Sequence, residues 1–69
     1  MEIKHYSMII QWSDEDQAYL VTVPELPGCM THGNTYEEAV QQGQDAVEGW
    51  IQVAQELGNP IPPPNKVAA

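Results

Sequence analysis

The sequence VPELPGCMTHGNTYEE, residues 23 to 38, decides the fold of this chain. Pro24 and Pro27 each fix φ and lack a backbone N–H, so the segment cannot lie inside a central strand. Pro27 precedes Gly28, a pair that favours a tight turn because glycine adopts positive φ without steric cost. Gly33 interrupts the chain again before a polar Asn-Thr pair. The stretch therefore predicts the end of one strand, a turn, a short strand and the start of a helix.

A long helix is predicted directly after this stretch. Thr35 is the expected N-cap, with Glu38 three residues later as its capping-box partner and Asn34 as the alternative cap. From residue 36 to residue 57 apolar side chains recur at steps of three and four, which predicts an amphipathic helix. Gly58 and the following Asn-Pro pair predict its end. Of the two interior glycines, Gly43 lies on the apolar stripe, which indicates close approach of a strand, whereas Gly49 lies nearer the polar side and has no explanation from the pattern.

Three strands are predicted before the helix. Residues 3–12 and 18–23 have strand-forming composition and are separated by the polar segment 13–17, which favours an antiparallel hairpin. Residues 29–32 form the short third strand. The expected fold is α+β, a small three-stranded antiparallel sheet with one long helix on one face, followed by an extended proline-rich tail with room for one further short strand. We expect a single domain over residues 1–64 and a disordered tail over 65–69.

Composition restricts the kinds of partner and cofactor. The chain has 69 residues, ten carboxylates, two lysines (Lys4 and Lys66), no arginine and a net charge of −8. Nucleic-acid backbones need cationic side chains, so no direct nucleic-acid binding is expected. The acidity favours a basic partner, with solubility alone as the alternative. A single cysteine allows no internal disulfide, and neither a metal site nor a cofactor is expected. A domain this small is expected to associate with itself or a partner.

No apolar run is long enough for a membrane span or a secretory signal, so a cytoplasmic protein is expected. Enzyme-like residues are few. Asp14, Glu15 and Asp16 could hold a cation, but adjacent residues of one loop point different ways, and a solvated turn is favoured. Cys29 and His32 could pair as nucleophile and base, but positions three apart on a strand face opposite sides, so a buried structural cysteine is favoured. We therefore expect a non-enzymatic protein.

Two linked motifs resemble the HicB family of small antitoxins. PELPGC at residues 24–29 and GNTYEEA at residues 33–39 match the pattern of that family in order and spacing. The resemblance covers residues 6–64 and implies a partial RNase H-like fold. It also implies a non-catalytic protein that covers the active site of HicA, a small basic toxin that cleaves mRNA. Many relatives carry an additional DNA-binding domain, which is not expected here.

Two functions follow as hypotheses. In the first, the domain is an antitoxin that binds a basic HicA-type toxin, with the partner-binding residues Trp12, Asp14, Glu15, Asp16 and Glu25. For Trp12, an interface role and simple packing at the rim are both open, whereas Trp50 and Tyr36 are expected in the core. In the second hypothesis, the protein has no toxin partner and is a self-associating scaffold or binding module. It would form dimers or tetramers through the edge of the third strand at Thr31 and His32.

Overall fold

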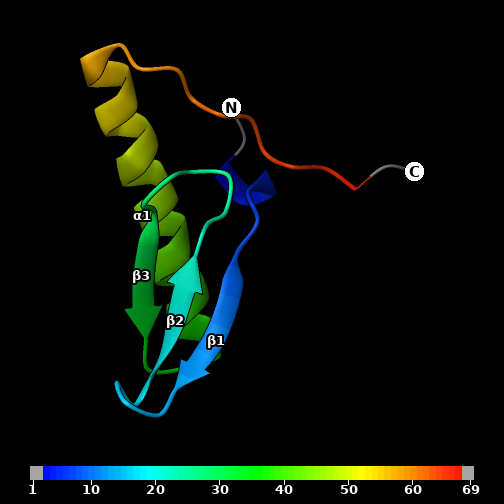
Figure 1. The fold of residues 1–69 in the computed structure, drawn as a ribbon, viewed down its shortest axis with the longest axis vertical. Coiled ribbons are helices and arrows are strands. Elements are labelled where there is room, and N and C mark those ends of the chain that lie inside the picture. Colours follow the sequence, from blue (N-terminus) through cyan, green and yellow to red (C-terminus); the bar gives the residue numbers. More distant parts are fainter. Residues whose placement is uncertain (1–2, 68–69) are drawn as a thin grey trace.

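The computed structural model describes residues 3–67, which form one three-stranded antiparallel sheet and one long helix (Figure 1). A short 3-10 helix, η1 (Ile3–His5), is followed by the strands β1 (Ile9–Ser13), β2 (Ala18–Thr22) and β3 (Met30–Gly33). The helix α1 (Tyr36–Leu57) completes the fold. The predicted α+β class is therefore confirmed.

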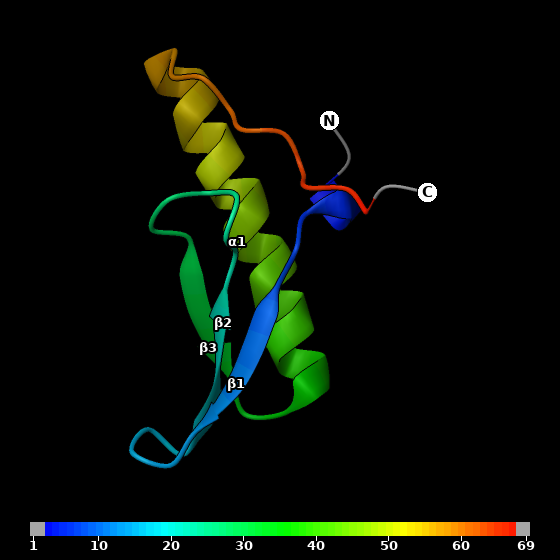
Figure 2. The same cartoon turned by 45° about the vertical axis from the view of Figure 1, so that its right-hand side comes forward.

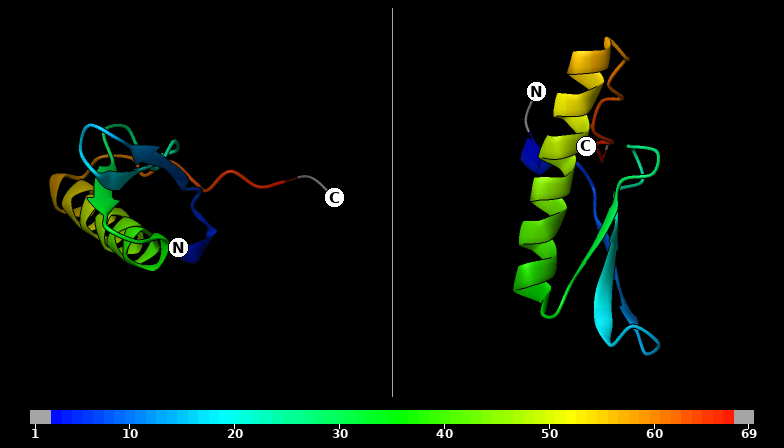
Figure 3. Two further views of the ribbon diagram at one scale, coloured as in Figure 1. Left: turned by 90° about the horizontal axis from the view of Figure 1, so that it is seen from below. Right: turned by 90° about the vertical axis from the view of Figure 1, so that its left-hand side faces the viewer.

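The sheet and the helix form two layers, which are seen edge-on in Figure 3. The strand order is β1-β2-β3, so β1 and β3 are the outer strands, and both pairings are antiparallel. The register places Ile10, Val21 and Thr31 in one row on the side that faces α1. The neighbouring row, Ile9, Thr22 and Met30, has the opposite side-chain direction and faces away from the helix. One face of the sheet is thus covered and the other is open.

The first strand is shorter than the sequence predicts. A strand over residues 3–12 was expected, but β1 begins only at Ile9, and residues 3–5 form η1. The reason is Tyr6, whose N–H donates to the carbonyl of Ile3 at 3.3 Å and whose side chain is only 5% exposed. Because burial of the Tyr6 ring turns the chain inward, the preceding residues cannot continue along the sheet.

The ends of α1 agree closely with prediction. Thr35 has extended backbone angles, and its Oγ1 accepts the N–H of Glu38 at 3.0 Å. The Glu38 carboxylate in turn accepts the N–H of Asn34 at 3.1 Å, one residue earlier than in a standard capping box. At the other end Gly58 adopts φ 70°, and its N–H donates to the last turn.

Two glycines allow the helix to lie close to the sheet. A Cβ at Gly33 would stand 2.5 Å from the backbone nitrogen of Ala39 in the first turns of α1. A Cβ at Gly43 would stand 2.7 Å from Met8 Sδ and 3.2 Å from Val21 Cγ1. The predicted close approach at Gly43 is therefore confirmed, and Gly33 is a second such position.

The loop that follows β2 packs its apolar side chains into the core. Leu26 is 1% exposed and lies with Tyr6, Val23, Cys29 and Val47 in one buried cluster. The Cys29 N–H donates to the Leu26 carbonyl at 3.0 Å, and Gly28 has φ 76°, so Leu26 to Cys29 form a type II turn. The sequence PELPGC therefore supplies both a turn and part of the core.

The segment after α1 runs back across the domain to the N-terminal residues (Figure 2). The Tyr6 hydroxyl donates to the Pro62 carbonyl at 2.6 Å, and the Asn65 N–H donates to Glu25 Oε2 at 3.0 Å. Up to residue 67 this segment forms no strand, so it does not extend the sheet. Of the tail predicted over residues 65–69, the last two residues lie outside the described part of the chain.

Candidate partner-binding surface

The β1–β2 hairpin carries the three adjacent carboxylates at its exposed tip. Asp14 Oδ1 accepts the indole N–H of Trp12 at 2.6 Å, and the Ser13 hydroxyl donates to Asp16 Oδ2 at 3.1 Å. The Asp16 N–H also donates to Ser13 Oγ at 3.2 Å, which holds the loop in shape. Glu15, between them, is exposed. The tip is thus an ordered acidic loop with its negative charge in contact with solvent.

Trp12, which bonds this loop, begins a row of three aromatic rings. Trp12 meets Tyr19 edge-on, with ring centroids 5.1 Å apart, and Tyr19 stacks on Tyr36 at 4.5 Å. Trp12 is 50% exposed and Tyr36 is 59% exposed, although aromatic side chains normally bury most of their surface. We call Trp12, Tyr19 and Tyr36, together with the loop carboxylates Asp14, Glu15 and Asp16, the aromatic–acidic end.

Glu25, the fifth predicted partner-binding residue, lies apart from this surface. It is 9% exposed, and its Oε2 accepts three hydrogen bonds, from the N–H and hydroxyl of Ser7 at 2.9 Å each and from the N–H of Asn65 at 3.0 Å. Burial alone would raise the pKa of Glu25, but these hydrogen bonds favour the charged form and hold its pKa below the ordinary value. Glu25 therefore ties the N-terminal segment and the tail to the PELPGC loop.

The other candidate residues lie at the third strand. Cys29 is 5% exposed, and burial raises the pKa of its thiol, whereas His32 is exposed and has Leu20 as its β2 partner. The two side chains are not brought together as a nucleophile and base. Thr31 is half-buried on the helix side of the sheet. β3 is an outer strand, as the edge hypothesis requires.

Residues 3–67 contain no cluster of three or more His, Cys, Asp or Glu side chains that could hold a metal ion. No helix in this part of the chain has the length and apolar character needed to cross a bilayer. The arrangement at the aromatic–acidic end suits recognition, because exposed rings and carboxylates can contact a cationic surface without any chemical step.

The sequence profile of the HicB-like antitoxins of bacterial toxin–antitoxin systems matches residues 6–69. The chain belongs to this family. The match contains both motifs, PELPGC and GNTYEEA, which form the core turn and the capped start of α1. Membership of this HicB-like family supports an antitoxin role and a toxin as the kind of partner.

Relatives of similar length extend the comparison for this HicB-like chain. A UPF0150 protein of Thermoplasma acidophilum is 40% identical over 60 residues, which cover 87% of this chain and 86% of the relative. A UPF0150 protein of Archaeoglobus fulgidus is 35% identical over 70% of this chain and 68% of its own length. A third, from Synechocystis, is 31% identical over 88% of this chain and 76% of its own length.

For Tyr36, at the aromatic–acidic end, the prediction of a core position is wrong. This residue falls on the apolar stripe of α1 and was expected in the core, yet it is 59% exposed. As the first residue of α1, it lies where the helix meets the end of the sheet, and its ring stacks on Tyr19. Its position as the first residue of α1, next to the N-cap Thr35, was the available signal.

Proposed function

We propose that this domain is an antitoxin that binds a small basic HicA-type ribonuclease toxin and covers the toxin's active site. The main support is the aromatic–acidic end: the half-exposed Trp12 bonds Asp14 of the acidic loop, and Tyr19 links Trp12 to the exposed ring of Tyr36. The family match supports a toxin as partner. Inhibition by covering a site requires affinity and shape, so the proposal needs no catalytic group on this chain.

Charge supports a basic partner. The net charge of −8 creates a field that attracts a cationic protein and raises the rate of encounter. The loop carboxylates Asp14, Glu15 and Asp16 are at the tip of the hairpin, where they would meet such a partner first. A ribonuclease that binds RNA phosphates presents the complementary positive surface. We place the encounter in the cytoplasm, where mRNA is available.

The rings provide the short-range part of recognition. A lysine or arginine side chain over an aromatic face gains about 0.5–2 kcal/mol, depending on how far it is desolvated. Trp12 is positioned for this contact because its side chain is 50% exposed while its indole N–H is held by Asp14. Buried aromatic anchors commonly contribute most of the affinity of an interface. Trp12 and Tyr36 are therefore the expected anchors.

The test first looks for a short basic open reading frame immediately next to this gene, and then co-expresses and purifies its product for titration. Trp12→Ala and Tyr36→Ala should each lower its affinity at least about tenfold, the equivalent of 1.4 kcal/mol. Gln55→Ala, on an exposed part of α1 away from these rings, is the control and should leave affinity unchanged. Unaltered affinity in both aromatic variants would refute the proposed surface, and absence of any complex would refute the antitoxin role.

Electrostatic attraction adds a kinetic test. The association rate should fall as salt rises, because exposed charges are screened beyond about 8–10 Å at physiological ionic strength. Glu15→Gln should slow association more than Glu48→Gln, which removes the same charge from an exposed position on α1. Equal association rates in low and high salt would contradict capture by charge.

The open face of the sheet favours self-association as a second function. Three apolar side chains are exposed there, Ile9 at 46%, Leu20 at 40% and Met30 at 70%. β3, with Thr31 and His32, is an outer strand whose backbone can pair with a second copy. Sedimentation should then show a dimer or tetramer that Leu20→Glu converts to a monomer. A wild-type monomer at micromolar concentration would exclude this function.

A further inference from the structure

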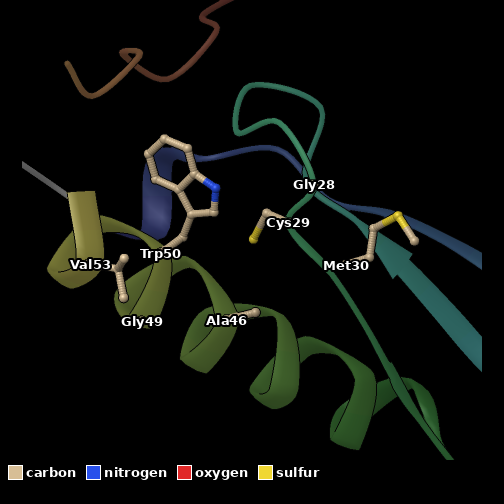
Figure 4. A pocket seen from close by; sticks show the side chains of 7 residues that line it. All are labelled: Gly28, Cys29, Met30, Ala46, Gly49, Trp50 and Val53. Atoms are coloured by element: carbon tan, nitrogen blue, oxygen red, sulfur yellow. The ribbon is translucent and has the colours of Figure 1, made fainter. Parts of the chain in front are cut away.

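A second surface lies at the other end of β3, where α1 and the PELPGC turn border an open groove of about 350 Å³ (Figure 4). Gly28, Cys29 and Met30 line it from the strand side, and Gly49, Trp50 and Val53 line it from the helix. The Trp50 indole N–H donates to the Pro27 carbonyl at 2.9 Å, which fixes the ring as one wall. The lining is predominantly apolar, and Val53 is 53% exposed, whereas Met30 borders the groove with its side chain pointing away from α1.

Gly49 is the unusual residue of this groove. A glycine inside a helix is less favourable than an alanine at the same position. Gly43 in the same helix has a structural reason, since a Cβ there would meet Met8 and Val21. At Gly49 a Cβ would meet nothing within 4 Å. Packing within residues 3–67 therefore does not require glycine at this position, and its effect is to keep the groove open beside Trp50.

The rim of the groove is acidic. Asp45 lies one helical turn before Gly49, and Glu56 lies three residues after Val53, so both share the helix face that borders the groove. Both carboxylates are exposed. A second copy of this chain would bring its own charge of −8 and only two lysines to this rim. Like charge disfavours that occupant, whereas a cationic segment with an apolar anchor matches both the lining and the rim.

We propose that this groove is a second docking site for the toxin, and that it takes an apolar side chain from a segment flanked by lysine or arginine. The inference rests on the proposed antitoxin function but concerns a surface distinct from the aromatic–acidic end. Contact at both surfaces would enlarge the area that the domain covers on its partner. It would also explain why a glycine is present at a helix position where the isolated domain gains nothing from it.

The two tryptophans allow each surface to be followed separately. In a ¹⁵N-labelled sample Trp12 and Trp50 give one indole signal each, and Trp→Phe variants assign them. On addition of the adjacent-gene basic protein, the Trp50 signal should shift together with that of Trp12. A shift of Trp12 alone would overturn the groove while leaving the antitoxin function intact. A Trp50 shift with increasing concentration of the domain alone would instead identify a second copy as the occupant.

Substitution at Gly49 separates stability from binding. Gly49→Ala should raise the melting temperature by about 4–8 °C, since alanine favours the helix and the added methyl meets no neighbour. Gly49→Gln, which projects into the groove without changing charge, should lower affinity for the toxin at least tenfold, whereas Gln55→Ala should not. Unchanged affinity in a folded Gly49→Gln protein would overturn the proposal, even if the toxin binds the wild type tightly.

Discussion

Replacement of Glu25 by glutamine should destabilise the domain, although it removes one charge from a strongly acidic protein. Oε2 accepts three hydrogen bonds, two from Ser7 and one from Asn65. A hydrogen bond to a charged group contributes about 1.5–3 kcal/mol and a neutral one about 0.5–1.5 kcal/mol, so each of the three weakens by about 1 kcal/mol in Glu25→Gln. Relief of the desolvation of the carboxylate offsets part of this loss, which leaves a net cost of about 2 kcal/mol.

Urea unfolding followed by circular dichroism measures this cost. A chain of this length has a total stability of about 3–10 kcal/mol, so a loss of about 2 kcal/mol is a large fraction. With a slope of about 1 kcal/mol per molar urea, the midpoint should fall by about 2 M. Glu15→Gln is the matched control, because it makes the same chemical change at an exposed position and should stay within about 0.5 kcal/mol.

The pH dependence tests whether the charged form of Glu25 supplies this stability. Hydrogen bonds hold the pKa of Glu25 below its ordinary value in the folded state, despite the opposing effect of burial. The stabilisation is therefore present above the unfolded-state pKa and is lost as the pH falls through the folded-state value. The difference in urea midpoint between wild type and Glu25→Gln should therefore become smaller as the pH is lowered through the folded-state pKa of Glu25. Equal midpoints at pH 7, or a gap that does not change with pH, would show that these bonds do not stabilise the fold.

Three further predictions concern other parts of the fold. Gly33→Ala should lower the free energy of unfolding by about 3 kcal/mol, because the new Cβ would stand 2.5 Å from helix backbone that cannot move aside. Calorimetry would detect this loss, and an unchanged melting temperature would contradict the close packing. Thr35→Ala should cost about 1 kcal/mol in urea unfolding through loss of the helix cap, whereas Thr35→Ser should be neutral. Cys29 should react with iodoacetamide much more slowly in the native protein than in urea, because the thiol is buried and burial raises its pKa. Mass spectrometry would measure both rates, and equal rates would show that the thiol is exposed to solvent.

Local sequence signals predicted most of the fold. The helix boundaries followed from the cap at Thr35, the apolar period and Gly58, each of which acts within a few residues. The turn after Pro27 was predictable for the same reason, since it depends only on proline and glycine backbone preferences. The first strand was predicted too long because Tyr6 is held by a carbonyl 56 residues away, and no local pattern contains that contact.

The surfaces were harder to predict than the fold. The acidic loop and Trp12 were recognisable from composition, but an apolar period cannot distinguish a buried ring from one at the end of a layer, and Tyr36 was misplaced for that reason. Glu25 was taken for a surface carboxylate, because its hydrogen bonds join three segments that are distant in the sequence. Gly49 stood out as a helical glycine without a reason, and a Cβ at this position would meet nothing within 4 Å.

The proposed antitoxin inhibits its partner without any catalytic step of its own. The decisive measurement is cleavage of mRNA by the adjacent-gene basic protein, with increasing amounts of this domain added. We predict that cleavage falls to background at about equimolar domain, as expected for tight occlusion, and that Trp12→Ala shifts this point to higher concentration. Full cleavage in the presence of excess folded domain, or cleavage of RNA by the domain alone, would contradict the account.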